Sequence, residues 1–314
     1  MTIDPQRIVD PLSEEREMDT RADKILEGAI DMHCHGYPEV AFDVKMRMED
    51  LAWLKLAADA KMKAVVLKSH MWPTVGRVFY LKQLITDIEI IPSITLNLST
   101  GGLNPWAVES AARQGAKVVW MPTWTAMNDL KRNGMSRFMR GYLKTLDKMK
   151  PEEGITVLDS SGHLVTPVKE ILHLAKEKDL VVSTGHLSPE ESLSLARFCK
   201  EIGFTKLIFG HPDSGSVGGT LDHVKEMAAM GFYIEFAFLG MLPAFQRIKP
   251  AQLIEMIMAA GPDHCILSSD YYFEWVPPPS EMMRMYIATL LDFEVSETDL
   301  KKMVCHNPAL LFNM

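Results

Sequence analysis

Two histidines separated by a single residue lie near the start of the chain, in the stretch Ile30-Asp31-Met32-His33-Cys34-His35-Gly36. On a β-strand, residues i and i+2 point to the same face, so His33 and His35 are expected to aim their imidazoles at one point. Gly36 allows a turn or the close approach of a ligand. Two convergent imidazoles suit a divalent metal such as zinc. Isolated His-x-His motifs also occur as ordinary loop residues, so the rest of the chain decides between these interpretations.

Four further apolar runs are followed by residues of types that can bind metals or substrates. These residues are Lys68 and His70 after the second run, His186 after the fifth, His211 after the sixth and Asp270 after the eighth. Five of the ten histidines therefore follow such runs, which chance does not readily explain. If the runs are parallel strands of a barrel, their carboxyl ends meet at one face and these side chains converge there.

The runs that should form strands are short, β-branched and ended by glycine, proline or polar residues, as buried parallel strands are. They are Ala29–His33, Ala64–Lys68, Glu89–Leu96, Lys117–Met121, Leu180–Thr184, Lys206–Phe209, Phe232–Phe236 and Cys265–Ser269. Helical patterns separate them: Met48–Ala60, Pro105–Gln114, Pro167–Lys178, Pro189–Ile202, Leu221–Met230 and Pro250–Ala260. This alternation predicts an α/β fold, a (β/α)8 TIM barrel, with a doubly wound open sheet as the alternative.

Two features are expected outside the regular barrel. Residues 1–28 should form an N-terminal helical extension, with a helix over Pro11–Glu27, and residues 29–314 a single barrel domain. Between the fourth and fifth strands, Ile155–Val165 is typical of a small hairpin insertion, with its turn at Asp159–Gly162. The preceding basic, methionine-rich segment Thr125–Lys150 is expected to be a long loop with a helix.

Composition narrows the functional classes. The chain has 314 residues, of which 47% are hydrophobic and 24% charged, typical of a globular protein with a sizeable core. A net charge of −8 argues against nucleic-acid binding. The four cysteines lack Cys-x-x-Cys spacing, and neither a signal peptide nor a membrane-spanning apolar run is evident. We therefore expect a cytoplasmic protein that contacts no membrane. A small-molecule substrate and a homo-oligomeric assembly, common for soluble enzymes, are further expectations.

Taken in order, the strand-end residues resemble the signature of the amidohydrolase superfamily of metal-dependent hydrolases. That signature has His-x-His on strand one, histidines on strands five and six, and an aspartate on strand eight. The matching residues here are His33, His35, His186, His211 and Asp270. The resemblance extends over residues 28–314, including Asn307-Pro308 at the start of the last helix. Within the superfamily, the chain looks closest to uncharacterised members.

The resemblance implies a metal site made of those five residues and a metal-activated water that attacks an amide, lactone or ester. Asp270 would accept the proton of the water and pass it to the leaving group. His211 would either polarise the substrate carbonyl or complete the metal shell. The alternatives are a metal-assisted decarboxylase or lyase on the same scaffold, a phosphoesterase, and an inactive metal-binding barrel.

One position departs from the pattern of the superfamily. Many members with two metals carry a bridging lysine or glutamate on strand four, whereas that strand ends here in Trp120-Met121-Pro122-Thr123. We therefore expect one metal per chain, zinc first and manganese, iron or nickel as alternatives. Lys68 is interpreted as a free cation for an anionic substrate, with a carboxylated, bridging Lys68 as the alternative.

The remaining polar residues have more open roles. His70 is expected to contact the substrate, with metal ligation and a surface position as alternatives, and Thr123 is a further expected substrate contact. Glu235, inside the seventh strand, either faces the barrel mouth or is a buried structural acid. Asp213 is interpreted as a hydrogen-bond partner of His211 or as a helix cap.

Overall fold

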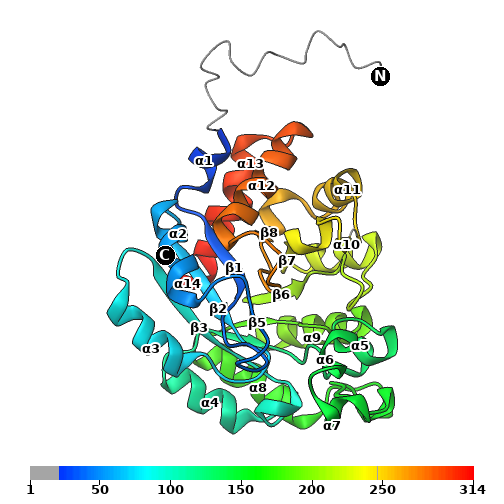
Figure 1. Cartoon of the computed structure of the whole chain (residues 1–314). Coiled ribbons are helices and arrows are strands. Elements are labelled where there is room, and N and C mark those ends of the chain that lie inside the picture. Colours follow the sequence, from blue (N-terminus) through cyan, green and yellow to red (C-terminus); the bar gives the residue numbers. More distant parts are fainter. Residues whose placement is uncertain (1–20, 246) are drawn as a thin grey trace, which may run out of the picture.

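Eight parallel strands form the centre of the molecule (Figure 1). They are β1 Ile30–His35, β2 Ala64–Lys68, β3 Glu89–Thr95, β4 Val118–Trp120, β5 Val181–Ser183, β6 Leu207–Gly210, β7 Tyr233–Ala237 and β8 Cys265–Ser268. Each strand pairs in parallel with the next one in the sequence, from β1 to β8. The structure is a computed structural model and describes residues 21–245 and 247–314.

The first and last strands lie side by side and nearly close the barrel. Cys34 forms a parallel bridge with Tyr271, which follows β8, and the backbone N–H of His35 donates to the carbonyl of Tyr271 at 3.0 Å. Sequential pairing with such a seam is the topology of a (β/α)8 barrel. The predicted fold class is therefore confirmed, and the doubly wound open sheet is wrong.

Alternation along the strands divides the apolar side chains between two cores. One set fills the barrel interior: Ile30, Met32, Ala64, Val66, Ile91, Val118, Trp120, Val181, Ile208 and Ile266. The intervening residues, such as Val65, Leu67 and Val182, pack outwards against the helices. The interior is thus a filled core, and space for a ligand remains only at the ends of the strands.

Helices cover the outside of the barrel (Figure 1). The longer ones are α2 Asp50–Asp59, α3 Val75–Leu84, α4 Pro105–Arg113, α8 Thr166–Glu177, α9 Pro189–Ile202, α10 Leu221–Ala229, α11 Pro250–Ala260 and α12 Pro279–Asp292. Helix α9 begins with a capping box, in which Ser188 Oγ accepts from the N–H of Glu191 and Glu191 Oε2 accepts from the N–H of Ser188. The chain ends in α13 Glu297–Lys301 and α14 Asn307–Phe312.

The regions outside the regular barrel follow the sequence only in part. Of the expected helix Pro11–Glu27, residues up to 20 lie outside the described part of the chain, and α1 spans Arg21–Leu26. The hairpin is reduced to one antiparallel bridge between Leu158 and Leu164. The segment before it contains three short helices instead of one, α5 Met127–Arg132, α6 Ser136–Arg140 and α7 Lys144–Asp147. Among the helices of residues 21–314, none combines the length and apolarity needed to span a bilayer.

Candidate metal centre

The side chains of β1 and β8 meet at the carboxyl ends of the strands. Asp270 Oδ1 lies 3.1 Å from His33 Nε2 and 3.5 Å from His35 Nε2. Both histidines are buried, and Asp270 has 20% of its side chain exposed. Three potential ligand atoms, one from each residue, therefore lie close enough together to share a cation.

Tight backbone turns orient the residues that follow the other strands. His211 after β6 and Asp270 after β8 have positive φ angles of 26° and 51°, which non-glycine residues adopt infrequently. Gly185, just before His186, has a φ of 58°. Such backbone conformations are concentrated at functional sites, where the surrounding structure holds them in place. Each turn brings its side chain to the mouth of the barrel.

Every imidazole in this group has its Nδ1 atom occupied by an oxygen of the protein. The Nδ1 contacts are His33 to Glu235 Oε1 at 3.0 Å, His35 to Glu39 Oε1 at 3.3 Å, His70 to Thr123 Oγ1 at 3.0 Å, His186 to Asp129 Oδ2 at 2.7 Å and His211 to Ser214 Oγ at 3.3 Å. Partners of this kind orient metal-binding imidazoles and fix which nitrogen is free. The Nε2 atoms therefore face the centre, where a metal or a substrate could contact them, although Lys68 Nζ already lies 2.8 Å from that of His33.

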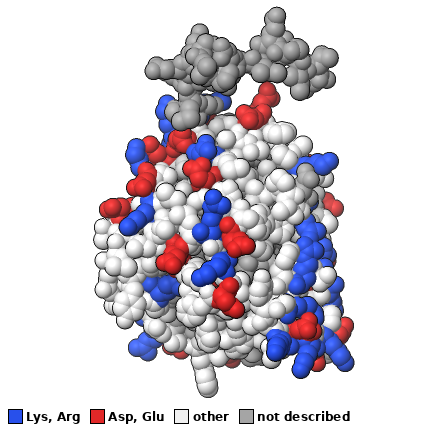
Figure 2. All heavy atoms as spheres, in the orientation of Figure 1, with Lys and Arg blue, Asp and Glu red and all other residues white. Residues whose placement is uncertain are grey.

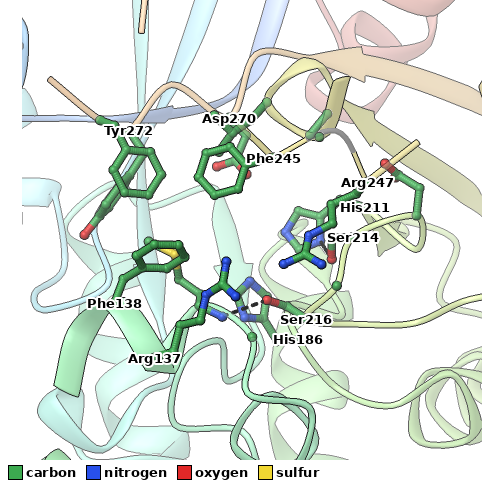
Figure 3. Close-up of a pocket in the computed structure, with 18 of the residues that line it drawn as sticks. Arg137, Phe138, His186, His211, Ser214, Ser216, Phe245, Arg247, Asp270 and Tyr272 are labelled. Atoms are coloured by element: carbon green, nitrogen blue, oxygen red, sulfur yellow. Dashed lines mark hydrogen bonds between the residues drawn. The ribbon is translucent and has the colours of Figure 1, made fainter. Parts of the chain in front are cut away.

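The five rings form one contiguous cluster. Ring centroids are 5.3 Å apart for His33 and His35, 4.5 Å for His35 and His70, and 5.1 Å for His186 and His211. The ring of His211 also stacks on that of His33 at 5.5 Å. Lys68, His70, His186, His211 and Asp270 line a single pocket. Figure 3 shows the last three of them at this pocket. The structure thus brings the residues that the sequence singled out to one end of the barrel, where the ligand atoms of His33, His35 and Asp270 lie within reach of one shared cation.

Burial determines the charges of the site. It lowers the pKa of His33 and His70 well below the ordinary value and that of His211 to about 3, so these rings are neutral at pH 7. Burial raises the pKa of Asp270, but the neighbouring His33 and His35 outweigh it and hold that pKa well below its usual range. Neutral imidazoles beside an ionised carboxylate are the donor set that a divalent cation requires.

Lys68 has an unusual position in this centre. Its Nζ atom is 2.8 Å from His33 Nε2 and 4.4 Å from the centroid of the Trp120 ring, and burial lowers its pKa to about 8. Trp120 ends β4, where a bridging acid would have to stand, and its ring packs on His33 at 4.6 Å. The ring of Trp120 and the ammonium of Lys68 therefore lie where an anionic residue would be needed to bridge two metal ions.

The hydrogen bonds around Thr123 define the tautomer of His70. Asn97 Oδ1 accepts from the N–H groups of Thr123 and Thr125, so its Nδ2 is the donor to Thr123 Oγ1 at 2.7 Å. Among the described residues no other acceptor is in hydrogen-bond reach of the buried Thr123 hydroxyl, so its proton is assigned to the bond with His70 Nδ1. His70 consequently carries its proton on Nε2, which suits a hydrogen-bond donor to a substrate better than a metal ligand.

Sequence reasoning missed several residues that support the site. Glu39 and Asp129 lie in a loop and in a short helix, and nothing in their local pattern marks them as partners of His35 and His186. Glu235 holds His33 and also accepts from Ser268 Oγ at 2.6 Å, which supports its role as a buried acid. Asp213 does not hold His211; Ser214 does, because the turn after β6 directs its hydroxyl to that ring.

Fold and site together define a (β/α)8 barrel with a candidate metal centre at the carboxyl ends of its strands. Similar solved structures include an amidohydrolase from Pseudomonas aeruginosa, with a TM-score of 0.64, 10% identity and coverage of 93% of this chain and 98% of the other. A 2,6-dihydroxybenzoate decarboxylase from Rhizobium has a TM-score of 0.56, 12% identity and coverage of 91% and 99%. A probable 2-pyrone-4,6-dicarboxylic acid hydrolase from Acinetobacter baumannii has a TM-score of 0.56, 14% identity and coverage of 91% and 100%.

At these identities the similarity concerns the fold. The chain belongs to a family of unknown function, DUF6282, whose model matches residues 28–235. No curated protein matches the sequence. The activity must therefore be inferred from the site itself.

Proposed function

We propose that the protein is a metal-dependent hydrolase of the amidohydrolase type, acting on an amide, lactone or ester of a small molecule. The observation that carries this proposal is the arrangement of the imidazoles, each with Nδ1 held by the protein, around the Asp270 carboxylate. His33, His35, His186 and Asp270 would hold the ion, with His211 beside them. A bound divalent ion, zinc being the expected one, would supply a water of lowered pKa and a Lewis acid for the carbonyl.

The residues of the chain then have distinct tasks. Asp270 is ionised and takes up the proton released in the reaction, which it returns to the leaving group. The Nε2–H of His70 donates to a substrate oxygen, and Thr123 keeps that ring in the donating tautomer. Lys68, at the pocket wall, contacts an anionic group of the substrate.

Metal analysis of protein purified without chelator tests the site. We expect about one zinc equivalent per chain, lost when His33 and His35 are both replaced by alanine, because two ligands are removed. The matched control is a His163→Ala/His306→Ala variant, which removes two exposed histidines and should keep the metal. Full metal occupancy in the His33→Ala/His35→Ala protein, with its circular dichroism spectrum unchanged, would contradict the proposed metal site.

A substrate screen on zinc-loaded protein tests the reaction. Lactones, aryl esters and amides should be turned over, and Asp270→Asn should lower that turnover by about 100-fold or more, since the amide cannot accept the proton. The screen should include benzoates with detection of released CO2, because a decarboxylase shares the fold. CO2 release without hydrolysis would assign a decarboxylase, and turnover of phosphate esters alone a phosphoesterase.

A further inference from the structure

Two arginines at the mouth of the pocket have no acidic partner in the described part of the chain. Arg137 belongs to α6 and Arg247 to the loop after β7, and both line the pocket whose floor carries His186 and His211. Figure 3 shows both guanidinium groups directed into this opening. Other described arginines, such as Arg77, Arg197 and Arg284, pair with acids. Within residues 21–245 and 247–314, neither Arg137 nor Arg247 pairs with an acid.

A third arginine nearby shows the contrast with a structural role. Arg132 Nε donates to the carbonyl of Gly215 at 2.9 Å and so fixes the loop after β6. The guanidinium of Arg247 packs against the same glycine: a Cβ added at Gly215 would lie 3.2 Å from Arg247 Cζ. Arg137 stacks on the ring of Phe138, with 4.5 Å between Cζ and the ring centroid. Their N–H groups are therefore available to a ligand.

Two positive charges aimed at one opening repel each other unless an anion lies between them. The whole chain has a net charge of −8, so this concentration of positive charge is local. Lys and Arg side chains gather at the lower right of Figure 2, where Figure 1 places α6 and α7. A guanidinium matches the geometry of a carboxylate, with which it forms paired hydrogen bonds.

Aromatic rings form the adjoining wall of the pocket. Phe138, Phe245, Tyr272 and Phe273 all line it. Phe273 lies 5.6 Å from Phe138 and 5.2 Å from Phe245, between ring centroids. The first two of these rings come from the same elements as the two arginines, α6 and the loop after β7. Flat apolar walls beside a cationic pair suit a planar ring that bears an anion.

We propose that the pocket binds a small aromatic carboxylate, whose carboxylate group contacts Arg137 and Arg247 and whose ring lies against Phe138, Phe245 and Phe273. This assignment rests on the proposed function, because it places the reacting end of that molecule at the metal centre. The two acids of the same pocket do not neutralise the arginines. Asp270 is engaged with His33 and His35, and among the described residues Asp213 forms no ion pair with either arginine.

Titration calorimetry on the zinc-loaded protein tests the proposal with benzoate, benzamide and acetate. Benzoate should bind at least about 10-fold more tightly than benzamide, which has the ring without the charge, and than acetate, which has the charge without the ring. Arg137→Ala and Arg247→Ala should each weaken benzoate binding by about 10-fold and leave benzamide binding unchanged. Arg113→Ala, which removes an exposed arginine at the far end of α4, is the matched control.

The proposal is overturned if benzoate does not bind, if benzamide or acetate binds equally well, or if both arginine variants keep the affinity of the wild type. A repeat with the His33→Ala/His35→Ala protein separates this proposal from the metal site. Loss of benzoate affinity on arginine substitution in that variant shows that the arginines act without the metal. If the protein holds zinc but the arginine substitutions leave benzoate binding unchanged, the aromatic carboxylate proposal is wrong and the metal-dependent function is untouched. If the protein holds no zinc but its benzoate affinity still depends on the two arginines, only the metal-dependent function is wrong.

Discussion

Lys68 and a metal ion would compete for the same nitrogen. The ammonium donates to His33 Nε2 at 2.8 Å, and this lone pair is the one that metal ligation by His33 requires. At an effective dielectric constant of about 20, a unit charge about 4 Å from another is worth about 4 kcal/mol. An unmodified Lys68 therefore opposes metal binding, whereas a carboxylated Lys68 would favour it.

Replacing Lys68 by methionine should reveal which form is present. If the side chain is an ammonium, Lys68→Met keeps one zinc per chain and binds it at least about 10-fold more tightly, because a neighbouring positive charge is gone. Competition with a chromogenic chelator measures that affinity, and Lys55→Met, on the exposed face of α2, is the control. Weaker binding, or a fall from two metals to one, would instead establish a carboxylated Lys68.

At the scale of single residues, the sequence indicated the candidate ligands but not their supports. His186 and Asp270 directly follow apolar strands, so the barrel geometry predicts where they point. Glu39 lies in the loop after β1, and Asp129 lies in α5, after β4. Only the folded loops bring these acids to Nδ1 of His35 and His186. Such contacts depend on loop conformation, for which a single sequence carries little signal.

At the scale of elements, β1 carries a buried acid beside the metal centre. Asp31 Oδ1 accepts from the N–H groups of His33 at 3.1 Å and Ser269 at 3.0 Å, which connects β1 to the end of β8. Burial raises the pKa of Asp31 from 3.8 to about 6. Between these pH values the folded state binds more protons than the unfolded state, so this group lowers the stability as the pH rises.

The variant Asp31→Asn should remove that dependence on pH. An amide oxygen can still accept both N–H groups, and it does not ionise. The free energy of unfolding of the variant, relative to wild type, should therefore rise between pH 4 and pH 7 by about 2 kcal/mol, because the whole pKa shift is worth about 3 kcal/mol and part of it falls below pH 4. Urea denaturation of metal-free protein measures this difference. A relative stability that is constant over the range would show that Asp31 is not perturbed in the folded state.

Long periodic elements could be predicted, whereas short ones could not. The bounds of α9 and α11 agree with the periodicity, and proline follows the N-cap in both. Helices α5, α6 and α7 have four to six residues each, too few for a helical pattern to emerge. The position of Arg137 at the pocket therefore became visible only in the structure.

At the scale of the whole molecule, the candidate ligands come from opposite sides of the barrel. His33 and His35 end β1, Asp270 follows β8, and His186 follows β5. In the described residues, the backbone pairing at the seam between β1 and β8 consists of a single bridge and one adjoining hydrogen bond, to which Asp31 adds a side-chain contact with Ser269. A cation held by these residues would link both sides of the seam to the far wall, so metal binding and folding should be coupled.

Zinc should accordingly stabilise the whole barrel. A ligand that binds only the folded state raises the free energy of unfolding by about 2.7 kcal/mol when its free concentration is 100 times its Kd. We expect the midpoint of urea denaturation to rise with buffered free zinc, with an unchanged dependence on urea concentration, because the surface exposed on unfolding stays the same. The His33→Ala/His35→Ala protein should show no response to zinc, while His163→Ala/His306→Ala should respond as wild type does. An equal zinc response in the two double variants would mean that the ion acts elsewhere on the chain, and the proposed centre would then have no part in stabilising the fold.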